Sequence, residues 1–170
     1  FELSPESAAL LADEDAMVFL GASFIPMPHR IGMVERLPEA FRSGHGLTWD
    51  DRGVASAEST ELMFRNWYRQ MLVPVALPAL DGVVARLEAG VRVADVGCGT
   101  GRSLLEMAKA FPRSEFHGFE ISAFALERAA HNRHEAGVSN VTFHNANTNP
   151  LPGDAGFNLD LSKRLEQADA

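Results

Sequence analysis

The stretch Val91–Gly101, VRVADVGCGTG, decides the fold of this chain. Its first six residues form a short β-branched run, which is typical of a buried strand. The glycine-rich segment that follows leaves this strand and leads into a predicted helix over 103–111. Doubly wound sheets bind nucleotides at such a turn, because glycines let a ligand approach the backbone and the amides at the helix start donate hydrogen bonds.

Strands and helices alternate after this turn. Ser122 is a predicted N-cap and Gly137 a predicted stop for a helix over 123–136. The strands are predicted at 91–96, 115–119, 141–144 and 157–161. This order with short links predicts an α/β fold, namely the first half of a Rossmann-like doubly wound parallel sheet with right-handed crossovers. We expect residues 161–170 to form a helical tail.

A mainly helical region precedes the sheet, and we place the boundary near Gly90. Apolar spacing predicts helices over 7–20 and 31–41, a third from Ser59 or Thr60 to 72, and a fourth over 79–88. Residues 47–53 are predicted to form a loop. The domains are therefore a helical region, 1–90, and a ligand-binding domain, 91–170, whose sheet is incomplete.

Composition and charge exclude several classes of protein. The 170 residues are 46% hydrophobic and 22% charged, which is ordinary for a globular domain. The net charge of −8 makes nucleic acid an unfavourable partner for this segment, and favours a small-molecule substrate. No apolar run is long enough for a membrane helix. The single cysteine, Cys98, fits a reducing cytosol, so we expect a cytoplasmic protein.

The spacing of the glycines limits the class of ligand that the turn can bind. Gly97, Gly99 and Gly101 give G-x-G-x-G, whereas a dinucleotide fingerprint requires G-x-G-x-x-G and a P-loop ends in Lys-Ser/Thr. Glu120 follows the second strand, where a carboxylate can accept hydrogen bonds from both hydroxyls of a ribose. Asn147 follows the third strand, and its amide can both donate to and accept from an adenine edge.

These residues carry a resemblance to a known family. Val93–Gly101 resembles the first motif of class I S-adenosylmethionine-dependent methyltransferases, Phe119-Glu120 resembles their acidic second motif, and Asn140–Phe143 with Asn147 resembles their third-strand region. Leu77–Val83 and Met107–Pro112 look like a bacterial subgroup with an amino-terminal winged-helix domain, and Phe1–Glu6 resembles the end of that domain.

The resemblance implies roles for individual residues. Asp95 and the loop residues Gly97, Cys98, Gly99 and Gly101 would shape the pocket around the methionine part of S-adenosylmethionine. Glu120 would hold the ribose, Ile121 would pack on adenine, and Asn147 would face its exocyclic amine. The family usually has Asp where Asn147 stands, and a register shifted by two would place Asn145 there instead.

The activity that the resemblance implies is methyl transfer to an unidentified small-molecule acceptor by in-line displacement. The alternative is a winged-helix regulator or pseudoenzyme whose methyltransferase-like domain only binds a ligand. No catalytic residue is assigned. The resemblance also implies a longer natural protein, of which this chain is a fragment, and allows a homodimer through the amino-terminal domain.

Other residues have simpler interpretations. Cys98 has no neighbouring histidine in sequence to activate it, so we interpret it as a packing residue rather than a nucleophile. His131 and His134 lie three apart on a helix, but a solvated face is favoured over a ligand set and no metal site is expected. Phe64, Trp67 and Tyr68 are interpreted as a helical core stripe rather than the lining of a substrate cavity.

Overall fold

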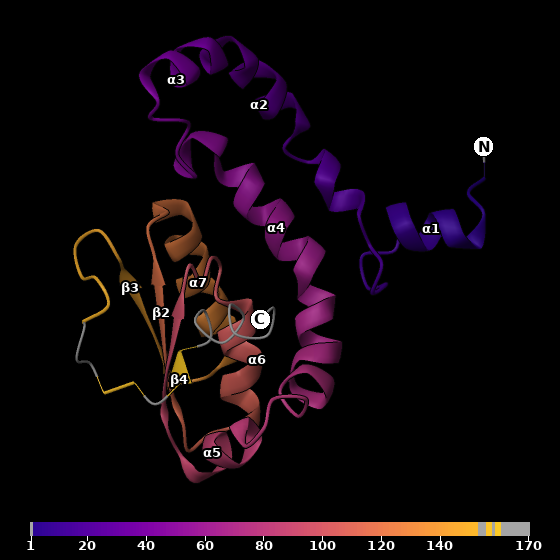
Figure 1. The fold of residues 1–170 in the computed structure, drawn as a ribbon. Helices are drawn as coiled ribbons and strands as arrows, with labels where there is room; N and C mark the ends of the chain where they lie inside the picture. Colours follow the sequence, from indigo (N-terminus) through magenta and orange to yellow (C-terminus); the bar gives the residue numbers. More distant parts are fainter. Residues whose placement is uncertain (1, 153–155, 158, 161–170) are drawn as a thin grey trace. The chain divides into compact units, whose positions relative to one another are not determined.

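The computed structural model describes residues 2–152, 156–157 and 159–160 (Figure 1). The chain divides into two compact units, Phe1–Asn66 and Trp67–Ala170. The division therefore falls before the boundary near Gly90 that the sequence indicated. The reason is packing, because Leu77 and Leu87 are buried in the same hydrophobic cluster as Val93 and Phe116 of the sheet.

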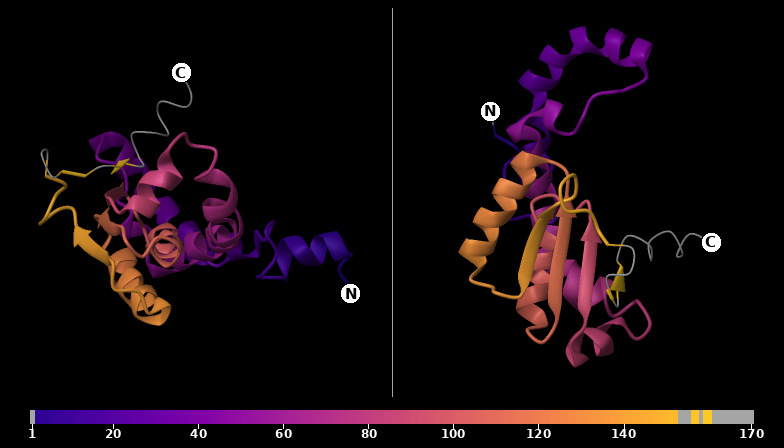
Figure 2. Two further views of the ribbon diagram at one scale, coloured as in Figure 1. Left: turned by 90° about the horizontal axis from the view of Figure 1, so that it is seen from below. Right: turned by 90° about the vertical axis from the view of Figure 1, so that its left-hand side faces the viewer.

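Four parallel strands form the sheet of the second unit, in the order β3-β2-β1-β4. They are β1 (Arg92–Val96), β2 (Glu115–Glu120), β3 (Val141–Asn145) and β4 (Leu159–Asp160). Figure 2 shows the first three side by side. Val96 pairs with Phe119, and Glu120 pairs with Asn145, so the carboxyl ends of β1, β2 and β3 lie at one edge. The predicted α/β fold with a Rossmann-like sheet is confirmed, and the fourth strand pairs with the first.

Helices α6 (Arg102–Ala110) and α7 (Ala123–Ala136) pack against each other and against β2 and β3. The predicted caps of α7 are confirmed: Ser122 Oγ accepts from the amide of Ala125 at 3.2 Å, and Gly137 ends the helix with φ 65°. Side chains from α6 and the strands form the core, among them the fully buried Leu104, Met107 and Phe116. The predicted tail over 161–170 lies outside the described residues.

In the second unit, two helical elements, η4 and α5, precede β1. The π-helix η4 (Tyr68–Ala76) contains Pro74 and packs against α6. The helix α5 (Val83–Ala89) begins four residues later than predicted from the sequence, because Gly82 before it has a left-handed conformation with φ 70°. Gly90 ends α5 with φ 96°.

The first unit consists of short helices joined by turns. They are α1 (Pro5–Leu11), η1 (Gly21–Phe24), α2 (Met27–Gly32), η2 (Met33–Arg36), α3 (Leu37–Ser43), η3 (Asp50–Arg52) and α4 (Val54–Trp67). The predicted helix over 7–20 is wrong beyond Leu11, because the Asp13 carboxylate accepts from the amide of Asp15 and forms a turn. None of the helices in the described ranges has the length and apolar character of a membrane span.

Two further predictions for this unit need correction. The helix predicted over 31–41 begins earlier, because α2 starts at Met27 with Pro26 as its N-cap residue and Pro28 in its first turn, where proline is tolerated. The third helix begins at Val54, not at Ser59 or Thr60, and the Thr60 hydroxyl donates to the Ser56 carbonyl at 2.9 Å inside α4. The predicted loop over 47–53 contains the short helix η3.

Candidate functional site

The turn between β1 and α6 is held in place by hydrogen bonds to neighbouring elements. The backbone amides of Gly97 and Cys98 donate to the carbonyl of Phe119, at 2.7 and 3.2 Å, so the turn continues the pairing of β1 with β2. The Thr100 carbonyl accepts from Nδ2 of Asn132 on α7 at 3.1 Å, and Asn132 is fully buried. The turn is thus a fixed part of the sheet edge rather than a free loop.

The three glycines of the turn all have left-handed backbone conformations, with φ values of 78° at Gly97, 54° at Gly99 and 76° at Gly101. Side chains are disfavoured there by the backbone alone. Their surroundings differ. Nothing lies within 4 Å of a Cβ placed on Gly97 or Gly99, whereas a Cβ on Gly101 would meet the ring of Phe143. Gly97 and Gly99 therefore leave space against the backbone that a ligand can fill, while Gly101 is required for packing.

The Glu120 side chain connects the end of β2 to this turn. It is buried, with 8% of its surface exposed. Its Oε2 accepts from the amide of Gly99 at 2.9 Å, and its Oε1 accepts from the amides of Ile121 and Ser122 at 2.8 and 2.9 Å. A carboxylate has about four acceptor positions. Glu120 therefore shapes the turn and retains capacity to accept a hydrogen bond from a ligand hydroxyl.

Ile121 and Asn147 lie at the ends of adjacent strands. The Ala146 amide donates to the Glu120 carbonyl at 2.9 Å, and Nδ2 of Asn147 donates to the Ile121 carbonyl at 3.4 Å. Ile121 is 54% exposed, so its apolar surface is available to a planar ligand. Oδ1 of Asn145 accepts from the Asn147 amide at 2.9 Å, which turns the Asn145 side chain back onto the chain. Of the two alternatives from the sequence, this geometry favours Asn147 as the exposed amide.

Asp95 lies on β1, half-buried, and its Oδ2 accepts from the hydroxyl of Ser103 on α6 at 3.1 Å. Burial, together with the negative charge of Asp95, raises the pKa of Tyr68 on η4 above its usual value. The Tyr68 phenol therefore stays protonated near neutral pH, and it lies close enough to Asp95 to respond to its charge. No pattern in the sequence groups these two residues.

The surroundings of the Cys98 thiol disfavour the thiolate form that a nucleophile requires. Burial raises its pKa far above the usual range, and the charges of Asp95 and Glu120 act in the same direction. Its Sγ would lie 2.6 Å from a Cβ on Gly118, so the thiol packs against the β2 backbone. Its interpretation as a packing residue is supported by this environment.

The histidines on α7 lie on its exposed surface. His131 Nε2 lies 3.3 Å from Glu135 Oε1, and both side chains are more than half exposed. Among the described residues, no group of three or more histidine, cysteine or acidic side chains is arranged to hold a metal ion.

The structure brings the predicted ligand-binding residues to one edge of the sheet, from the ends of three adjacent strands. Hydrogen bonds join the turn after β1 to Glu120, and join Ile121 to Asn147. Sequence reasoning missed Tyr68 and Ser103 as neighbours of Asp95. The residues that it placed at this edge are Asp95, Gly97, Cys98, Gly99, Gly101, Glu120, Ile121 and Asn147.

Comparisons with known proteins identify the same part of the chain. Residues 87–168 match the methyltransferase-domain family. The matched residues include the glycine turn, Glu120 and Asn147, which form the edge described above. The methyltransferase match thus begins within the last turn of α5, at residue 87, and the helical residues before this point lie outside the match.

Two curated relatives are tRNA (guanine-N(7)-)-methyltransferases. The relative from Synechococcus sp. is 41% identical over 76 residues, which cover 45% of this chain and 32% of the relative. The relative from Microcystis aeruginosa is 33% identical over 79 residues, which cover 46% of this chain and 37% of the relative. The chain therefore spans about a third of the length of these relatives.

Two solved structures share the fold over most of this chain. A putative O-methyltransferase from Nostoc punctiforme has a TM-score of 0.55 at 20% identity and covers 84% of this chain and 42% of its own. An O-methyltransferase family protein from Burkholderia thailandensis has a TM-score of 0.54 at 12% identity and covers 85% of this chain and 43% of its own. At these identities the likeness concerns the fold alone.

Proposed function

We propose that this chain binds S-adenosylmethionine at the sheet edge and transfers its methyl group to a small-molecule acceptor. The observation that carries the proposal is the buried carboxylate of Glu120, which is hydrogen-bonded to the Gly99 amide and retains acceptor capacity at the end of β2. This arrangement joins a hydroxyl-accepting group to a glycine turn that is open to a ligand.

The residues at this edge fit the chemical parts of the cofactor. Open space at Gly97 and Gly99 would admit the methionine part against the backbone, with Asp95 beside it. Glu120 would accept from a ribose hydroxyl at its remaining acceptor position. Ile121 would pack on the adenine ring, and Asn147 would face its amine. These assignments rest on the family resemblance and on the positions of the side chains.

The bound cofactor would supply a methyl group already activated as a sulfonium, so the protein's task is alignment rather than activation. The hydrogen bonds that fix the turn to Phe119 and Asn132 hold the backbone in one geometry. The raised pKa keeps the Tyr68 phenol protonated near neutral pH, within range of the Asp95 charge. We assign no general base, because none is required when the acceptor is itself a good nucleophile.

A small-molecule acceptor is proposed over nucleic acid because of the net charge of −8. The named activity of the two curated relatives on tRNA makes RNA the other acceptor to be tested. The match to a methyltransferase-domain family supports transfer rather than ligand sensing alone. From the resemblance we further propose that the helical region before α5 continues from a winged-helix domain.

The test uses the protein at its natural length and a methyl-labelled S-adenosylmethionine. Label is followed into a library of small-molecule nucleophiles and, separately, into total tRNA. We expect transfer to a small molecule, and we expect Glu120→Gln to reduce it by at least about tenfold. Glu115→Gln, an exposed change on the same strand, should leave the rate unchanged. Label in tRNA alone would contradict the proposed small-molecule acceptor. Cofactor binding without any methyl transfer would contradict the enzyme and support the alternative, a regulator whose methyltransferase-like domain only binds a ligand.

A further inference from the structure

A cavity of about 410 Å³ lies within the helical unit, between α2, η2, α3 and the residues that follow α3. Its wall is apolar on one side, where Met33, Leu37, Phe41 and Leu47 contribute. The Phe41 ring is 83% exposed although it borders this cavity. Cavities of this size with an apolar lining and a few polar groups are typical of small-ligand sites.

The wall formed by η3 is fixed by a group of hydrogen bonds around Asp51. The carboxylate of Asp51 accepts from Arg36 Nη2 at 2.6 Å and from the amide and hydroxyl of Thr48 at 2.7 Å. A ring nitrogen of His29 on α2 lies 2.7 Å from the Asp51 carbonyl oxygen. The hydrogen bonds from Thr48 and Arg36 lower the pKa of Asp51 to about 2, so its carboxylate is ionised at any ordinary pH. These hydrogen bonds hold η3, and with it this side of the cavity, in a defined position.

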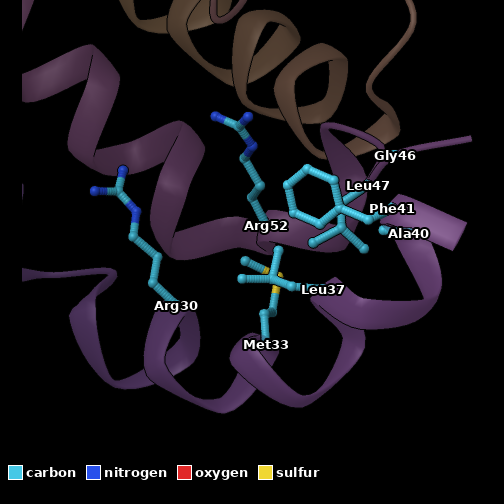
Figure 3. Close-up of a pocket in the computed structure, with 8 residues that line it drawn as sticks. All are labelled: Arg30, Met33, Leu37, Ala40, Phe41, Gly46, Leu47 and Arg52. Carbon is cyan, nitrogen blue, oxygen red and sulfur yellow. The ribbon is translucent and has the colours of Figure 1, made fainter. Parts of the chain in front are cut away.

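Two arginines complete the lining, Arg30 from α2 and Arg52 from η3. The Arg52 guanidinium lies over the Trp49 ring, 4.7 Å from its centroid. In the part of the chain that the structure describes, neither guanidinium pairs with a carboxylate, and the Asp51 carboxylate is already bound by Arg36. In Figure 3 both arginine side chains run toward the top of the view, and the apolar residues Leu37 and Phe41 lie to their right.

We propose that this cavity binds a small organic anion with an apolar body and a terminal carboxylate. The apolar body would lie against Met33, Leu37 and Phe41, which removes exposed apolar surface from water. The carboxylate would accept hydrogen bonds from Arg30 and Arg52, whose planar guanidinium groups suit a carboxylate. Charge complementarity selects an anion over a neutral or cationic ligand of the same shape. This site lies wholly in the helical unit and does not depend on the proposed methyl transfer.

The test uses decanoate as the probe, with decanol as the uncharged ligand of equal chain length. The chain has two tryptophans, so Trp67→Phe leaves Trp49 beside Arg52 as the single fluorescent reporter. We expect decanoate to change the Trp49 emission in a saturable way and to bind at least tenfold more tightly than decanol. Glu120→Gln should not alter this binding, which separates the site from the proposed cofactor site.

Variants assign the binding to the two arginines. Calorimetric titration should show that Arg30→Gln and Arg52→Gln each weaken decanoate binding about tenfold, as expected for the loss of a charge-assisted hydrogen bond. Arg42→Gln is the matched control, because Arg42 lies on α3 and pairs with Glu39 outside the cavity lining. The three arginine side chains changed here are all exposed, and circular dichroism checks that the variants fold. Equal binding of decanol, an unchanged affinity in both arginine variants, or no binding of decanoate would each overturn the proposal.

Discussion

Alanine substitutions at Gly101 and at Gly97 separate two costs of a side chain in the glycine turn, namely backbone strain and a clash with Phe143. Both glycines have left-handed conformations, with φ 76° and 78°. A side chain in this region costs about 1–2 kcal/mol. At Gly97 no further cost arises, because a Cβ there meets nothing within 4 Å. At Gly101 a Cβ would lie 2.6 Å from Cε1 of Phe143 and closer still to Cζ, and overpacking of this kind costs about 1–3 kcal/mol more.

We therefore expect Gly97→Ala to lower the free energy of unfolding by about 1–2 kcal/mol and Gly101→Ala by about 2–5 kcal/mol. The assay is urea unfolding followed by circular dichroism, with the midpoint and slope fitted for each variant. A Phe143→Ala background is the control, because it removes the ring and should bring the two alanine variants to similar penalties. A Gly97→Ala variant as destabilised as Gly101→Ala in the presence of Phe143 would refute the reasoning.

Three further predictions concern the sheet unit. Ser122→Ala removes the N-cap of α7 and should lower the free energy of unfolding by about 1 kcal/mol in urea titrations, whereas the exposed Ser139→Ala should change it by less than about 0.5 kcal/mol; equal effects would contradict the cap. Burial lowers the pKa of His117 and of His144 below 6.5, so the unfolded chain binds protons at a higher pH than the folded chain does. The urea concentration at the unfolding midpoint should therefore fall as the pH is lowered below about 6.5. His117→Gln should make this fall shallower, and an equal or steeper fall would contradict the assignment. The raised pKa of Cys98 should make its alkylation by iodoacetamide at pH 8 slow in the folded protein and fast in urea, and rapid labelling of the folded chain would show that the thiol is accessible and ionised.

The sheet unit could be predicted from the sequence because its signals are local. Ser122 and Gly137 bound α7 in the structure as in the prediction, since capping depends on residues next to the helix end. The first strand was predicted from its β-branched run. The placement of the candidate residues at one edge followed from these elements, because parallel strands bring their carboxyl ends together: Glu120 ends β2 and Asn147 lies just past β3.

The helical unit was predicted less well, because contacts between distant residues decide it. Apolar spacing continued the first helix through Asp13, although the side chain of this residue forms a turn that ends it. The proximity of Tyr68 to Asp95 and the arginine-lined cavity likewise depend on residues separated in sequence. No periodicity relates Arg30 to Arg52, and only the packing of α2 near η3 places them on one cavity.

The most direct test of the central claim is a calorimetric titration of S-adenosylhomocysteine into the protein at its natural length. The proposed site predicts saturable binding of one equivalent, weakened at least about tenfold by Glu120→Gln because the hydroxyl-accepting carboxylate is lost. The exposed change Glu115→Gln at the opposite end of β2 should leave the affinity unchanged. No binding by the folded protein, or equal binding by the wild type and Glu120→Gln, would contradict the assignment of this edge as the cofactor site.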